Sequence, residues 1–117
     1  MRIEIRGRNV EVDEELREHI LKRFRQVGKQ VSPLATLDVE LSEERNPSIS
    51  DSQVAEATLR LKGVTLRARE ASPDMGHTIH ELAEDVRRQV KRHREKRRKR
   101  RQTRRIVNRM RGRTAES

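Results

Sequence analysis

The side chains best placed to do chemistry are cations gathered near the carboxyl end of the chain. Between Lys91 and Arg113, fourteen of 23 residues are Lys or Arg, and only Glu95 opposes them. Residues 91–117 carry a net charge of +12, whereas residues 1–90 carry a net charge of −2. A segment this highly charged cannot be buried and holds a counter-ion atmosphere. Because phosphates release those ions, nucleic acid is the favoured partner; a solvated, disordered tail is the alternative.

Further cations lie on the outer faces of two expected amphipathic helices. At 100° per residue, Lys22, Arg25 and Lys29 lie within about 60° of one another, opposite an apolar stripe. Taken alone, this stripe is more typical of an ordinary solvated helix face. Taken with the second helix and the basic segment, it predicts one continuous positive surface. The candidate phosphate-binding residues are Lys22, Arg23, Arg25, Lys29, Arg88, Lys91, Arg92, Arg94 and Lys96.

A metal-dependent enzyme is a weaker hypothesis. His77 and His80 are three residues apart, with Glu81 and Glu84 close by, but no third set of ligands stands out. The five glycines are scattered, so there is no Gly-rich phosphate loop, and the absence of Cys excludes a thiol nucleophile. We therefore predict no metal site, no cofactor, no small-molecule substrate and no catalytic residues.

Composition narrows how nucleic acid would be bound. Phe24 is the only aromatic residue, so the chain cannot build the stacking platforms that read single-stranded bases. Binding is expected to depend on shape and phosphate charge, with Arg as the stacking side chain. No apolar run approaches the ~18–20 residues of a membrane span, and no secretory signal is visible. We expect a cytoplasmic protein that does not bind membranes.

The elements that must position these residues alternate between strands and helices. Apolar residues recur at every second position in residues 2–6, 37–41, 55–61 and 66–68, which predicts four strands. Asp13 starts a helix that runs to about Gly28, and Ser72-Pro73-Asp74 starts a second, with Ser72 as its cap. The order β-α-β-β-β-α predicts an α+β fold, a two-layer sandwich with two helices on one face of a four-stranded sheet.

Two parts of the chain are expected to differ in order. Residues 1–94 form the α/β domain, and residues 95–117 form a basic tail. Arg and Lys favour helices, but like charges four residues apart repel. The tail is therefore expected to be disordered alone and to become ordered on a polyanion. We assign no role to Ile106, Val107 and Met110.

Three groups of residues together resemble a known family. The first is Gly7-Arg8-Asn9-Val10-Glu11-Val12 with Leu16-Arg17-Glu18, and the second is Ala71-Ser72-Pro73-Asp74-Met75 with Ile79 and Leu82. The third is Arg88-Gln89-Val90-Lys91-Arg92-His93-Arg94. In order and spacing they resemble the ribosome hibernation promoting factors and ribosome-associated inhibitors, over residues 2–96. That family has the same β-α-β-β-β-α order.

The resemblance implies a concrete activity. Members of that family bind the small ribosomal subunit and its rRNA at the decoding region, where they block mRNA and tRNA sites during stress or stationary phase. The positions that match the family's rRNA contacts are Arg23, Lys29, Arg88, Arg92, Arg94 and Lys96. Where the family usually has a Tyr-Phe pair at the end of the first helix, this chain has Gln30-Val31, which predicts a thinner core there.

The sequence thus predicts a non-catalytic translation inhibitor that binds the small ribosomal subunit. A generic double-stranded nucleic-acid binder that acts through its tail is one alternative. An assembly factor or ribosomal-protein-like component is another. Self-association, and whether ribosomes are only silenced or also paired, stay open, as does whether the chain is a short form or a piece of a longer one.

Overall fold

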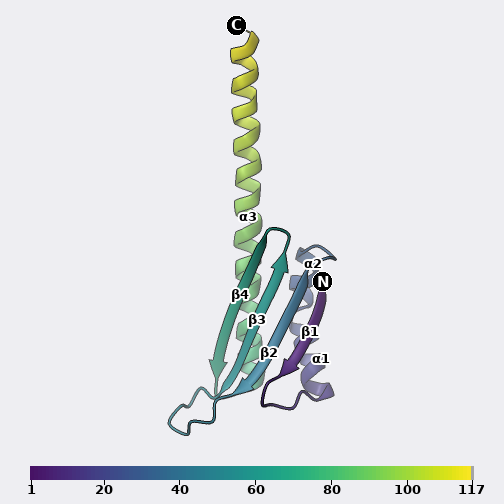
Figure 1. Cartoon of the computed structure of the whole chain (residues 1–117), viewed down its shortest axis with the longest axis vertical. Helices are drawn as coiled ribbons and strands as arrows, with labels where there is room; N and C mark the ends of the chain where they lie inside the picture. The colour runs from purple at the N-terminus through teal and green to yellow at the C-terminus, as the bar shows by residue number, and fades with distance from the viewer. Residues whose placement is uncertain (117) are drawn as a thin grey trace.

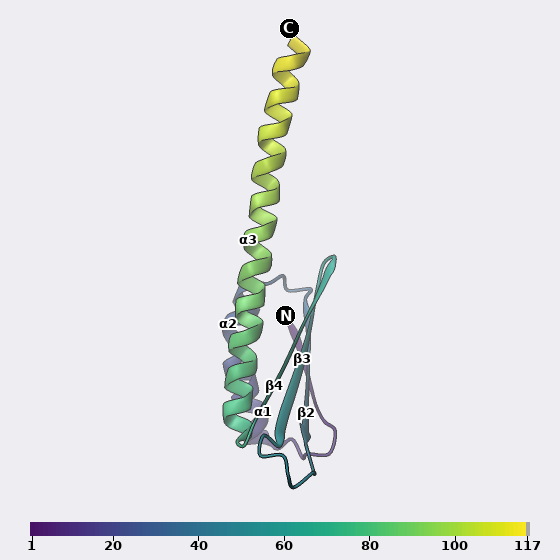
Figure 2. The ribbon, with the colours of Figure 1, turned by 90° about the vertical axis from the view of Figure 1, so that its left-hand side faces the viewer.

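Three helices lie on one face of a four-stranded sheet, as Figure 2 shows edge-on. The computed structural model describes the backbone of residues 1–116 and the side chains of residues 1–110. Figure 1 shows the elements in chain order. They are β1 (Arg2–Gly7), α1 (Glu14–Arg23), α2 (Arg25–Gln30), β2 (Thr36–Glu43), β3 (Gln53–Leu61), β4 (Val64–Ser72) and α3 (Met75–Glu116). The predicted two-layer α+β fold is confirmed.

The sheet follows the chain order β1-β2-β3-β4. β1 and β2 are parallel, with Ile3 opposite Leu37, because the chain crosses back through α1 and α2. β2, β3 and β4 are antiparallel neighbours. A tight turn at Lys62-Gly63 joins β3 to β4, and Gly63 adopts φ +79°, a conformation that glycine takes without steric cost.

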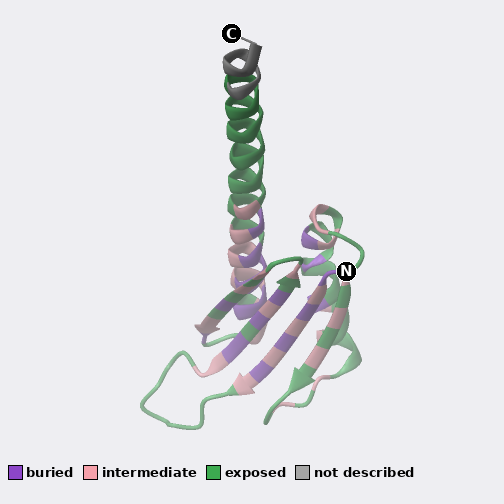
Figure 3. Ribbon diagram, turned by 45° about the horizontal axis from the view of Figure 1, so that its top comes forward, coloured by how far each residue is buried: buried purple, intermediate pink, exposed green. Residues whose placement is uncertain are grey.

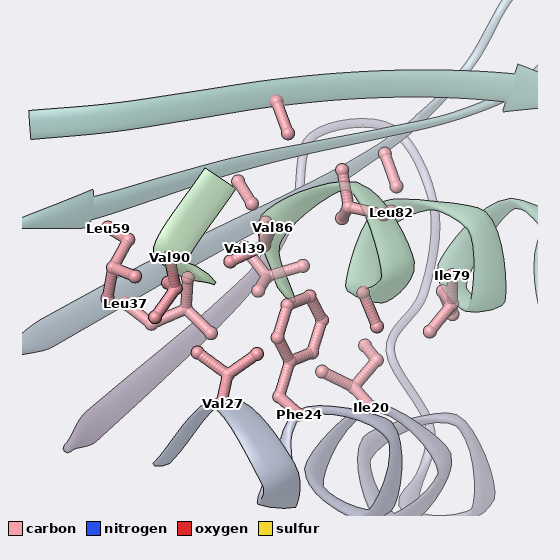
Figure 4. Close-up of a cluster of buried hydrophobic side chains, with 14 of the residues drawn as sticks. Ile20, Phe24, Val27, Leu37, Val39, Leu59, Ile79, Leu82, Val86 and Val90 are labelled. Carbon is pink, nitrogen blue, oxygen red and sulfur yellow. The ribbon is translucent and has the colours of Figure 1, made fainter. Parts of the chain in front are cut away.

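The core lies between the sheet and the helices (Figure 4). α1 and α2 contribute one apolar stripe and α3 a second, at the three- and four-residue spacings that keep side chains on one side of a helix. Phe24 is completely buried between the two stripes. The central side chains are Ile20, Phe24, Val27, Leu37, Val39, Leu59, Ile79, Leu82, Val86 and Val90. This shared core holds the α1–α2 pair and α3 side by side on the sheet.

The opposite face of the sheet is polar, and most of its arginines are paired with acids. Arg6, Glu40, Glu56 and Arg69 form one row across the four strands. Arg6 lies 3.9 Å from Glu40, and Arg69 lies 3.1 Å from Glu56. Arg60 pairs with Asp38 in the same way. The ion pairs with Glu40, Glu56 and Asp38 leave these arginines little free charge for a polyanion.

One of the two predicted helix starts agrees with the structure, and the other differs. Asp13 caps α1, since its side chain accepts a 2.8 Å hydrogen bond from the Leu16 amide. The second predicted cap, Ser72, is wrong: β4 runs through Ser72, and Asp74 accepts from the amide of His77 at 3.0 Å. Ser72 is instead buried, with its hydroxyl hydrogen-bonded to the Thr78 hydroxyl at 2.6 Å.

The first predicted helix is divided in two. Phe24, with φ −90° and ψ 2°, separates α1 from α2, and α2 ends at Gln30 instead of Gly28. The interruption turns the chain while Phe24 stays in the core. Both segments still contact α3, so the predicted basic faces remain on the same side of the sheet.

The basic segment continues α3 and differs from the disordered tail that the sequence predicts. α3 has 42 residues, and at 1.5 Å per residue it is about 63 Å long. Packing against the domain ends at His93, and residues 94–110 are exposed (Figure 3). The helix has already been nucleated by its packed half, so each further Arg or Lys adds a hydrogen bond without a new nucleation cost. The result is a molecule 73 Å in its longest dimension.

Candidate nucleic-acid interface

All nine predicted site residues are exposed on the helical side of the domain. None forms an ion pair within residues 1–110. The arginines Arg2, Arg6, Arg60 and Arg69 of the sheet, in contrast, each have an acidic partner. The free positive charge of the folded domain is therefore concentrated on the helices, and the residues that carry it there are Lys22, Arg23, Arg25, Lys29, Arg88, Lys91, Arg92, Arg94 and Lys96.

A long hollow brings part of this charge together. It has a volume of about 820 Å³, and it runs from Gln30, at the end of α2, along α3. Its cationic lining is Lys91, Arg94, Arg97, Arg98, Arg101 and Arg105. We call these six residues the basic trough. Four of them lie in the segment predicted to be disordered, so sequence reasoning gave them no defined position; their four- and three-residue spacing was the available signal.

Of the nine residues, Lys91 and Arg94 line the basic trough, whereas two others, Lys22 and Arg88, lie among acids. Lys22 lines a second hollow, of about 500 Å³, together with Asp13, Glu15 and Glu18. This hollow lies at the amino end of α1, whose first turns are acidic. The positive surface is therefore less continuous than predicted, and Lys22 contributes less to it than the cations of α3.

Arg88 is the other residue that lies near acids. Burial raises the pKa of the neighbouring Glu70, and the charges of Asp85 and Glu81 raise this pKa further. A hydrogen bond with Asp85 also raises it, whereas Arg88 lowers it. Asp85 in turn accepts a 3.3 Å hydrogen bond from Gln89. Part of the Arg88 charge is thus engaged by carboxylates on the β4 side of α3.

Replacing Glu70 by Gln is expected to stabilise the domain at pH 7.5 and to have a smaller effect near pH 4. The folded-state pKa of Glu70 is raised, so the fold disfavours the ionised form. That penalty is present above the raised pKa and is relieved as the pH falls through it. Thermal unfolding at both pH values measures the difference in Tm. Glu11→Gln, at an exposed position, is the control, and equal changes in Tm at both pH values would contradict the expectation.

The histidines do not assemble a metal site in the described part of the chain. No group of three His, Cys, Asp or Glu side chains lies close enough there to hold an ion. His77 lies 4.0 Å from Glu81, a contact within one helix, and His80 is half-buried. Nor does any helix among the described residues have the length and apolar character to cross a bilayer.

The arrangement suits the binding of phosphates along a backbone. Arginine presents a planar fork of donors that matches two phosphate oxygens, and six cations of the basic trough follow one edge of a helix. A rigid row of this kind neutralises successive phosphates without the ordering cost of a flexible tail. Fold and charge together define a small α+β domain with a basic helical side and a basic helical extension.

Comparison with known proteins identifies the family. The chain belongs to the Sigma 54 modulation protein / S30EA ribosomal protein family, whose model matches residues 3–98. The family resemblance predicted from the sequence is confirmed. A ribosome hibernation promoting factor of Acinetobacter guillouiae is 32% identical over 94 residues, which cover 76% of this chain and 83% of that protein.

A longer relative has a similar sequence, and two solved structures have a similar fold. A ribosome hibernation promotion factor of Picosynechococcus is 30% identical over 90 residues, and the match covers 76% of this chain but only 47% of that protein. The Thermus thermophilus Protein Y N-terminal domain is 25% identical, with a TM-score of 0.68 over 79% of this chain and 98% of that one. A Coxiella burnetii ribosomal subunit interface protein shares the fold, with a TM-score of 0.68 and 20% identity over 81% of this chain and 99% of that one.

Proposed function

We propose that this protein is a non-catalytic hibernation factor that binds the small ribosomal subunit and occludes its mRNA and tRNA sites. Its family and its hibernation-factor relatives support a ribosome-associated role. The proposed partner is the rRNA of the decoding region, and the proposed place of action is the cytoplasm. Binding to the small subunit in particular rests on the charge distribution described above.

One observation carries the proposal: exposed cations without acidic partners are concentrated on the helical side, while the arginines of the sheet are mostly paired. A partner with regularly spaced phosphates is complementary to that side and gains little from the other. The proposed contacts are the predicted site residues of α1, α2 and α3 together with the basic trough. Among the predicted residues, Lys91 and Arg94 line the trough, and Arg92 and Lys96 are their neighbours along α3.

Co-sedimentation with vacant ribosomes and with separated subunits tests the proposal. We expect saturable binding to the small subunit, near one protein per particle, that weakens between about 50 and 200 mM salt. A cell-free translation reaction then separates an inhibitor from an assembly factor or a ribosomal-protein-like component, because only an inhibitor lowers the yield. Binding to all RNA without saturation, or a yield that does not change, would contradict the proposal.

A further inference from the structure

An apolar pocket opens where α3 leaves the domain. It has a volume of about 530 Å³, within the range of sites that take small organic groups. Three segments surround it: the turn between α2 and β2, the β3–β4 hairpin and α3. Figure 2 shows the hairpin standing apart from α3 at this end of the sheet. The apolar lining is Val31, Leu34, Ala35, Leu61 and Val90.

Leu34 is the most unusual of these side chains, because it is 90% exposed. Its backbone is nevertheless held in place. The Leu34 amide donates to the Ser32 hydroxyl at 3.1 Å, and the Ala35 amide donates to the Ser32 carbonyl at 3.0 Å. The Ala35 carbonyl accepts from the Arg2 amide at 2.9 Å, which ties the turn to β1. A large apolar side chain is thus exposed to solvent on an ordered turn. Because the turn is already ordered, covering it with a ligand would cost little conformational entropy of the protein.

The rim of the pocket is basic and the lining contains no carboxylate. Lys62 comes from the hairpin turn, and Arg94 and Arg97 come from α3. Arg60 also lines the pocket but is paired with Asp38. An occupant with an apolar body and negative charge beside it matches this distribution.

The pocket adjoins the basic trough. Gln30, Arg94 and Arg97 line both hollows, so a chain of phosphates lying in the trough passes the mouth of the pocket. The Oε1 atom of Gln30 is buried and has no hydrogen-bond partner in the described part of the chain. A buried acceptor without a partner favours a ligand that brings an N–H donor. Nucleobases carry such donors on their edges, and their faces are apolar.

We propose that this pocket holds one unstacked nucleotide of the bound RNA. The base lies against the apolar lining, with an amino group directed at Gln30, while the flanking phosphates contact Lys62, Arg94 and Arg97. Unstacked bases are the part of RNA that proteins recognise directly, and aliphatic side chains and Arg planes can replace aromatic rings as the packing surface. An acidic peptide would also match the rim, but it would not use the continuity with the trough. This inference rests on the proposed function, since it requires RNA as the partner.

Three RNA hairpins of equal length test the proposal by fluorescence anisotropy. One carries a single bulged adenine, the second an abasic site at the bulge, and the third is fully paired. The adenine bulge is expected to bind about ten-fold more tightly than the abasic bulge, because the two share every phosphate and differ only in the base. Equal affinities would overturn the proposal.

Two matched variants locate the effect. Leu34→Glu places a charge at the mouth of the pocket without touching the core, and it should remove the preference for the adenine bulge. Ile49→Glu makes the same change at an apolar residue that is 42% exposed, in the loop at the opposite end of β2 and β3, and should keep the preference. A preference that survives in Leu34→Glu would place the base elsewhere and overturn the proposal.

Other outcomes separate this inference from the proposed function. Saturable binding to the small subunit with no discrimination between hairpins would refute the pocket alone. Loss of both would refute the proposed function as well. A peptide of alternating Glu and Leu that binds the wild type but not Leu34→Glu, without any preference for a base, would assign the pocket to a protein partner.

Discussion

Replacing Lys91 and Arg92 by Glu is expected to weaken binding to vacant small ribosomal subunits by about 100-fold or more. A charge-assisted hydrogen bond contributes ~1.5–3 kcal/mol, so the loss of two reaches this factor, and reversal adds repulsion from phosphate. Both residues are exposed and form no ion pair among the described side chains, unlike Arg88, which lies beside Glu70. Co-sedimentation at about 100 mM salt, near physiological screening, measures the change.

The control is Arg8→Glu with Arg45→Glu. These residues are also exposed but lie in loops at the end of the sheet where α3 begins, far along the helix from Lys91 and Arg92. The net charge therefore changes equally while the positive charge beside the basic trough stays intact. Screening over about 8–10 Å leaves the control pair only a small effect on binding. Similar losses for both pairs would mean that binding follows net charge alone and that the helical side is not the interface.

Removing residues 97–117 is expected to leave the domain folded and still able to saturate the small subunit, but with a flatter salt dependence. The core ends at Val90, and the removed segment carries ten basic residues, of which those up to residue 110 are exposed in the structure. Each lost phosphate contact reduces the slope of log K against log salt by about 0.7–0.9. Titrations from 50 to 200 mM salt, with the thermal midpoint as a check of folding, measure both properties.

The same truncation separates the proposed function from the generic alternative. A protein that binds nucleic acid only through its tail would lose nearly all its affinity, for ribosomes and for duplex RNA alike. The basic extension of α3 is the feature that supports binding through the tail alone. Saturable binding of the truncated chain to the small subunit would exclude it, and complete loss would support it.

The core and the order of the elements could be predicted because their signals are local. Ile3 and Ile5, or Leu37 and Val39, mark buried faces by alternation alone, and Phe24 falls in a stripe of regular spacing. Ser72 misled the prediction because a serine before Pro is a common helix start, whereas here its hydroxyl bonds to Thr78 in three dimensions. Sequence patterns alone do not distinguish a capping serine from one buried at the end of a strand.

The candidate site was only partly predictable. Residue spacing shows which cations lie on the outer face of a helix, and the nine residues are exposed as expected. The acids beside Lys22 and Arg88 come from other elements or other turns, and spacing along one helix does not show them. Most of the basic trough was missed because repulsion between like charges predicted disorder in residues 95–117. No sequence pattern marked Leu34 as part of a pocket, since a single exposed leucine in a turn is common. The pocket becomes visible only when the fold places the hairpin and α3 beside Leu34.

Because α3 is one continuous helix, it fixes the positions of its charges relative to the domain. From Arg97 to Glu116 the helix extends about 30 Å past the packed domain, at 1.5 Å per residue. A flexible arm of the same composition would sample many directions, whereas a helix fixes both the distance and the angle between two contacts. Under the proposed function, α3 would hold two contacts at a set distance. Two RNA elements would then be bound together only if they lie at that separation, and mismatched pairs would gain no avidity.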